Sequence, residues 1–131
     1  MKEQLVKAWQ LNNEKNLLFI DSINDEDMQK TLSTKGGRTV YLQLVHVHSV
    51  RLQWLEITAK DIIKKCKSLD KEAPYSKKEL RNGFEDSGKA IEELISASWD
   101  EGGKVKSFKN GLIPLITYLV AHEAHHRGHA L

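Results

Sequence analysis

The sequence of 131 residues predicts an all-α protein, a single four-helix bundle over residues 1–131. Four segments place apolar residues at spacings of three and four, which is the helical period. The segments between them are rich in glycine and other turn-forming residues. No segment has the convincing alternating pattern of a strand. A chain of this length is typical of one domain and can bury a core.

The first predicted helix runs from about Lys2 to Ile23. Its helical-period positions are Leu5, Ala8, Trp9, Asn12, Asn16, Phe19 and Ile23. Turn-forming residues then dominate positions 24–38, within which a short turn of helix is expected at residues 28–32.

The next two predicted helices begin at capping residues. Thr39 suits an N-cap because its hydroxyl can accept a bond from a free backbone N–H, and the second helix continues to about Cys66. Ser76 and Glu79 match a capping box, which begins a third helix that ends near Trp99.

The last predicted helix follows a glycine-containing loop at residues 100–111. Pro114 suits the first turn of a helix, where its missing N–H is not needed. We therefore predict helix from Leu115 to Leu131.

Composition excludes several classes of protein. No stretch approaches the roughly 18 uninterrupted apolar residues of a membrane span. The net charge of +2, from 20 basic and 18 acidic residues, gives no electrostatic case for binding nucleic acid, whose binders usually show a clustered basic face. The N-terminus lacks the apolar run of a signal peptide, and the single Cys66 cannot form an internal disulfide. We expect a cytoplasmic protein that binds neither nucleic acid nor membranes.

All six histidines lie in two of the predicted helices. His46 and His48 are on the second, and the last carries His122, His125, His126 and His129. At about 100° per residue, these four share one face of the last helix. Imidazoles at i and i+4 leave a helix on the same side and can bind one ion, so His122 and His126 are the strongest candidates for metal ligands.

A third ligand is expected from the second helix. His46 and His48 lie about 200° apart around it, so only one of them can face the same neighbour. We select His46 because it lies nearer to a heptad-like apolar seam, which consists of Val40, Val47, Val50, Trp54 and Ile57. His48 stays open as the alternative, because a second apolar stripe lies closer to it. That stripe consists of Leu44, Leu55 and Ile62.

Residues 122–126 also match His-Glu-x-x-His, the zinc motif in which the Glu is the general base of a metalloprotease. Proteases of this type need another ligand after the motif, and His129 is too close and lacks the usual Gly-containing turn. We therefore do not predict a protease. Glu123, rotated about 100° from His122, is expected to face either solvent or a partner helix.

Three stretches of the chain resemble the DinB/YfiT-like superfamily. They are AWQLNNEKNLLFIDSI near the start, RTVYLQLVHVHSVRLQWLE in the second helix and AHEAHHRGHAL in the last. The resemblance implies a four-helix bundle with long crossovers, often a homodimer. It also implies a metal site with one His from the second helix and an i, i+4 pair from the last, which corresponds to His46, His122 and His126.

The resemblance further implies a small-molecule substrate. Members of the superfamily include metal-dependent hydrolases and S-transferases that use bacillithiol, mycothiol or a related low-molecular-weight thiol, and others are DNA-damage-inducible proteins. We expect a metal-dependent hydrolase or thiol S-transferase. The alternative is a non-catalytic stress-response bundle that keeps its metal site.

Two departures from the family pattern concern the last helix. His129 stands where many relatives have Gln, which makes it a candidate for hydrogen bonding near the site. The chain ends at Leu131, whereas relatives usually continue this helix for several turns. We expect the helix to lack their C-terminal end.

Three imidazoles leave a divalent ion its full charge and an open coordination position, as in catalytic sites. Zinc, nickel and iron all suit these ligands. Such an ion acidifies water for hydrolysis or a thiol for transfer. His125 and His129 are candidate proton shuttles, with bonds to backbone or solvent as the alternative. Arg127 is a candidate for binding a substrate carboxylate or for a structural contact.

Overall fold

The structure, a computed structural model, describes residues 1–29, 39–69, 76–106 and 108–130; the side chains of residues 129 and 130 lie outside this description. These ranges contain helices and no strand, which confirms the all-α prediction. The long helices are α1 (Lys2–Ser22), α3 (Val40–Thr58), α5 (Lys77–Asp100) and α6 (Leu112–Ala130), and the short ones are α2 (Asp25–Met28) and α4 (Lys60–Ile63). Among these helices, none has the length and apolar character that spanning a membrane requires.

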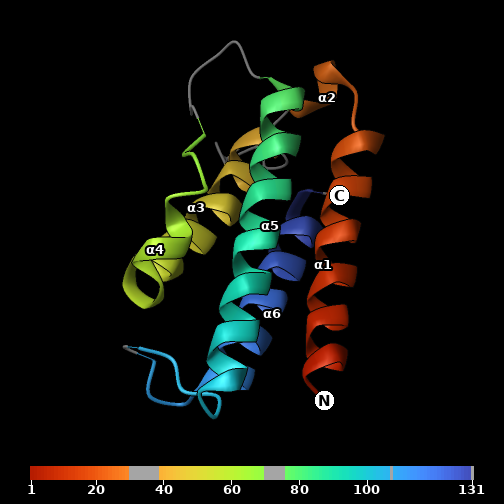
Figure 1. Cartoon of the computed structure of the whole chain (residues 1–131). Coiled ribbons are helices and arrows are strands. Elements are labelled where there is room, and N and C mark those ends of the chain that lie inside the picture. Colours follow the sequence, from red (N-terminus) through yellow and green to blue (C-terminus); the bar gives the residue numbers. More distant parts are fainter. Residues whose placement is uncertain (30–38, 70–75, 107, 131) are drawn as a thin grey trace.

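The long helices pack side by side (Figure 1). α1 packs mainly against α5, and α3 packs against both α5 and α6. α6 also contacts α1. α1 and α6 run in one direction along the molecule, and α3 and α5 run in the other (Figure 1). The C-terminal half of α6, which carries four of the six histidines, thus has α3 and α1 as neighbours.

The helix ends follow local capping chemistry. The Thr39 hydroxyl accepts a bond from the Leu42 N–H at 3.1 Å, and the Ser76 hydroxyl accepts one from the Glu79 N–H at 3.1 Å. Both predicted N-caps are confirmed. Pro114 lies in the first turn of α6, also as predicted, although α6 begins three residues earlier than expected.

The predicted length of the second helix is wrong. It ends at Thr58 because Ala59 leaves the helical conformation, with φ −155° and ψ 68°. The chain bends there and continues as α4, whose Ile62 and Ile63 pack against the hydrophobic core. The helical period of residues 39–66 does not reveal this bend.

The short helix α2 lies earlier than the turn predicted at residues 28–32. The Asn24 side chain accepts a bond from the Asp27 N–H at 2.8 Å and so begins the helix at Asp25. Residues 30–32 of the predicted turn lie outside the described residues.

The core consists of two hydrophobic clusters. One is built around Trp9, Leu55, Ile91 and Leu115, and the other around Ile20, Leu44, Leu80 and Phe84. The buried polar side chains include Asn12, Asn16, His48, Arg51, Ser87 and Glu123. Since Arg51 contacts an aromatic ring of each cluster, this polar layer lies where the clusters meet.

Candidate metal centre

Three histidines from two helices meet on one side of the molecule. His46 comes from α3, and His122 and His126 come from successive turns of α6. One ring nitrogen of each lies within 4.8 Å of those of the other two, and together they could hold a metal ion. All three side chains are half-buried, so each keeps some contact with solvent.

The distance between the two α6 imidazoles suits the binding of one metal ion by both rings. Their Nε2 atoms are 3.1 Å apart. Two nitrogens at about 2.0–2.1 Å from one tetrahedral zinc are separated by about 3.3–3.4 Å. The His46 ring centroid lies 5.2 Å from that of His122 and 4.7 Å from that of His126, so the third ring lies next to both imidazoles of α6. The donor set and its spacing therefore fit a divalent metal.

His48, the alternative third ligand, is fully buried on another side of α3. Its Nε2 lies 2.8 Å from the carbonyl oxygen of Lys67 and its Nδ1 3.1 Å from the Ser87 hydroxyl. Because a carbonyl only accepts, Nε2 carries the proton and Nδ1 accepts from Ser87. Burial lowers the pKa of His48, which keeps the ring neutral. Both nitrogens are occupied, and His46 is the histidine of α3 that faces α6.

Glu123 was predicted to face either solvent or a partner helix. It is buried against partner helices. Its carboxylate accepts bonds from Arg51 Nε at 2.8 Å and Arg51 Nη2 at 2.7 Å. It also accepts from the amides of Asn12 at 2.8 Å and Asn16 at 2.9 Å. The carboxylate of the His-Glu-x-x-His motif therefore forms a buried ion pair between α6 and α3, and it accepts hydrogen bonds from α1.

Arg51 packs its guanidinium group on two aromatic rings. The Trp9 ring lies 4.7 Å from its Cζ and the Phe84 ring 4.8 Å from it. Its Nη1 donates to the Phe84 carbonyl at 3.3 Å and to the Ser87 hydroxyl at 3.0 Å. Sequence reasoning did not select Arg51, although its position between Leu44 and Leu55 on an apolar stripe is a signal for a buried charge that needs a partner.

Arg127 makes a structural contact, one of the two roles expected for it. Its Nη1 donates to the side-chain oxygens of Asn12 at 3.0 Å and Asn16 at 2.6 Å. The amide groups of these asparagines donate to Glu123, so each asparagine connects Arg127 to the buried carboxylate. Burial lowers the pKa of Arg127, and the nearby Glu123 opposes this shift.

Of the two candidate proton shuttles, His125 has a described side chain. His125 is exposed, and its ring lies edge-on to His126 at 5.3 Å. His129 belongs to α6, but its side chain lies outside the described residues. On the other side of the cluster, the half-exposed Tyr118 stacks on the His122 ring at 5.9 Å.

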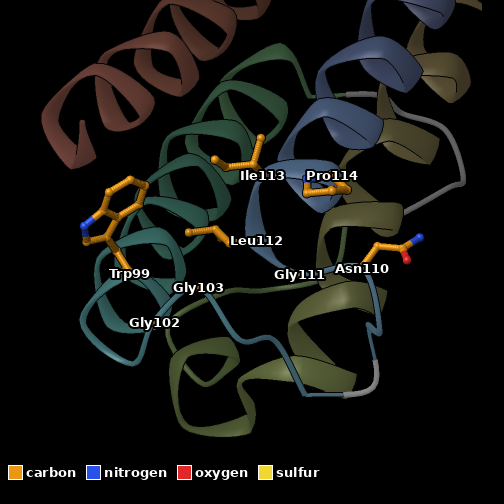
Figure 2. A pocket seen from close by; sticks show the side chains of 8 residues that line it. All are labelled: Trp99, Gly102, Gly103, Asn110, Gly111, Leu112, Ile113 and Pro114. Carbon is orange, nitrogen blue, oxygen red and sulfur yellow. The ribbon is translucent and has the colours of Figure 1, made fainter.

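A cavity of about 470 Å³ lies at the opposite end of α6 (Figure 2). It is lined by Trp99, Gly102, Gly103, Asn110, Gly111, Leu112, Ile113 and Pro114. The three glycines have positive φ values of 80°, 80° and 92°, which suit glycine in this tight loop. At 1.5 Å per residue, the histidines begin about 15 Å further along α6. The cavity and the histidine cluster are separate features.

The fold and the cluster define a helical protein whose three converging histidines could hold a divalent ion. A model of the DinB family matches residues 1–131, the whole chain. The protein therefore belongs to the DinB family. Comparisons with curated proteins and with solved structures gave no match.

Proposed function

We propose that the protein is a metal-dependent enzyme that acts on a small molecule. His46, His122 and His126 would hold the divalent ion, zinc, nickel or iron, on one side of a four-helix bundle formed by α1, α3, α5 and α6. One observation carries the proposal, namely the convergence of three half-buried imidazoles from two helices, with two Nε2 atoms 3.1 Å apart. His48, the other histidine of α3, lies outside this convergence, with its ring nitrogens bonded to Ser87 and Lys67.

A three-imidazole site leaves room for a reactant. Neutral ligands keep the full positive charge of the ion, and three of them leave at least one coordination position open. When bound, the ion supplies Lewis-acid chemistry that lowers the pKa of water or of a thiol.

Of the two predicted reactions, we propose thiol transfer first, with hydrolysis as the alternative; a hydrolase of the His-Glu-x-x-His type would lack its general base. Hydrolysis by a His-Glu-x-x-His protein uses the Glu as general base. Here Glu123 is fully buried and bonded to Arg51, Asn12 and Asn16, so it is not available to activate water. A low-molecular-weight thiol needs only to lose its proton and form a bond from sulfur to an electrophilic carbon, whose leaving group departs. We propose His125 as the proton acceptor, because it is exposed beside His126.

Metal analysis of untagged protein tests the site. We expect about one divalent ion per chain, and its loss in His46→Ala, His122→Ala and His126→Ala. His125→Ala is the matched control, because it removes an exposed imidazole from the same helix and should retain the ion. Absence of stoichiometric metal from the wild type, with no change in His126→Ala, would refute the proposal.

The selection of His46 is tested against His48. His46→Ala should weaken metal binding far more than His48→Ala, whose imidazole is bonded to Ser87 and Lys67. Circular dichroism at each measurement separates lost ligation from lost folding. The reverse order of affinities would show that His48 is the ligand.

Activity is tested by measuring conjugation of a low-molecular-weight thiol to a panel of electrophiles, in parallel with ester and amide hydrolysis. We expect conjugation that a chelator abolishes and added metal restores. Metal-dependent turnover in neither assay, from a protein that binds metal, would favour a non-catalytic role instead.

A further inference from the structure

Gln43 lies beside the histidine cluster and is not one of the three candidate ligands. It precedes His46 by three residues on α3, so both side chains leave the same side of that helix. Its side-chain oxygen lies 2.6 Å from Nδ1 of His126 on α6. The half-buried Gln43 therefore connects the helix of one candidate ligand to the ring of another.

This hydrogen bond determines the tautomer of His126. The amide oxygen of Gln43 can only accept, so Nδ1 of His126 carries the proton and donates it. In a neutral imidazole the other nitrogen then has a free electron pair. That nitrogen is Nε2, which faces Nε2 of His122 at 3.1 Å. The bond thus leaves the correct nitrogen of His126 unprotonated and directs it into the cluster.

We propose that Gln43 is a positioning residue of the metal centre, which fixes the tautomer and the ring orientation of His126. The inference rests on the metal site proposed above. Without the acceptor on α3, His126 can adopt the tautomer with a proton on Nε2, which cannot bind an ion, and its ring can rotate away. Partners of this kind typically contribute 10–100-fold to metal affinity.

The test is a zinc titration of metal-free protein in competition with a chromophoric chelator. Gln43→Met keeps the length of the side chain but removes the acceptor, and we expect it to weaken zinc binding about 10–100-fold. Gln43→Glu keeps an acceptor and should bind zinc within a few-fold of the wild type or more tightly. Gln53→Ala, which alters an exposed glutamine of the same helix, should leave the affinity unchanged.

A second measurement detects positioning directly. Nitrogen-15 NMR of the metal-free protein should show His126 protonated at Nδ1 in the wild type and in Gln53→Ala, and a shift toward the Nε2-protonated form in Gln43→Met. A purely structural role for Gln43 would leave this ratio unchanged.

The outcomes separate this inference from the proposed function. Zinc binding by Gln43→Met within twofold of the wild type, or Gln43→Glu as weak as Gln43→Met, overturns the role of Gln43 and leaves the metal site standing. Failure of the wild type to bind zinc, nickel or iron overturns the proposed metal site and the role of Gln43 with it.

Discussion

Replacing Glu123 with alanine should destabilise the protein more than any change at a surface charge. The substitution removes the carboxylate that accepts two bonds from Arg51 and one each from Asn12 and Asn16. Arg51 has no exposed surface, and its charge would lie uncompensated beside two aromatic rings. Breaking a buried pair in this way costs about 3–5 kcal/mol. Because typical domains have about 5–15 kcal/mol of stability, the loss is a large fraction of the total.

The assay is urea unfolding followed by circular dichroism, with a chelator present so that bound metal does not contribute to stability. With a slope of about 1–3 kcal/mol per molar urea, the expected loss moves the midpoint by more than about 1 M. Glu93→Ala is the matched control, since it breaks the exposed pair with Lys65, whose atoms are also 2.7 Å apart. Exposed pairs contribute about 1 kcal/mol or less.

Glu123→Gln separates charge from hydrogen bonding. It retains an oxygen that can accept bonds but removes the negative charge opposite Arg51, and we expect a loss smaller than that of Glu123→Ala. A loss below about 1 kcal/mol for Glu123→Ala, equal to that of Glu93→Ala, would refute the claim that this pair holds the helices together.

Two further predictions concern Trp9 in the core and Cys66 in the segment after α4. Trp9→Ala should lower stability by about 3–5 kcal/mol in thermal melts, since the side chain is buried and packs on Arg51. Trp9→Phe should lose about 1 kcal/mol, mainly the bond from Nε1 to the Gly88 carbonyl at 2.9 Å; equal losses in the two variants would contradict a packing role. Burial raises the pKa of the Cys66 thiol, so the folded protein holds less thiolate than the unfolded chain near pH 8.5. Iodoacetamide should therefore modify folded protein more slowly than protein in urea, and equal rates would contradict the prediction.

The parts of the fold that the sequence predicts are those fixed by local chemistry. The caps at Thr39 and Ser76 depend on residues three positions away, and they are found where predicted. The bend at Ala59 was not predicted. After it, Ile62 and Ile63 of α4 pack on the core. Nothing in the helical period of residues 39–66 distinguishes a straight helix from one that bends to make such a contact.

In the candidate site, too, the part that local geometry fixes was predictable and the part that depends on helix packing was not. The spacing of His122 and His126 follows from the geometry of one helix, whereas the choice of His46 over His48 depends on how α3 is rotated against its neighbours. Within α3, most residues of both apolar stripes are buried, since α3 packs against α5 and α6 at once. The apolar pattern alone therefore could not decide which histidine faces α6.

The buried polar layer explains why the three imidazoles meet. Glu123 follows His122 directly on α6, and its bonds to Arg51 and to the α1 asparagines fix the rotation of α6 about its own axis. That rotation points His122 and His126 toward α3 and places His46 and Gln43 opposite them. The Glu of the His-Glu-x-x-His sequence is thus bonded to α3 and α1 in this protein, while the two histidines of that sequence lie together with His46 of α3.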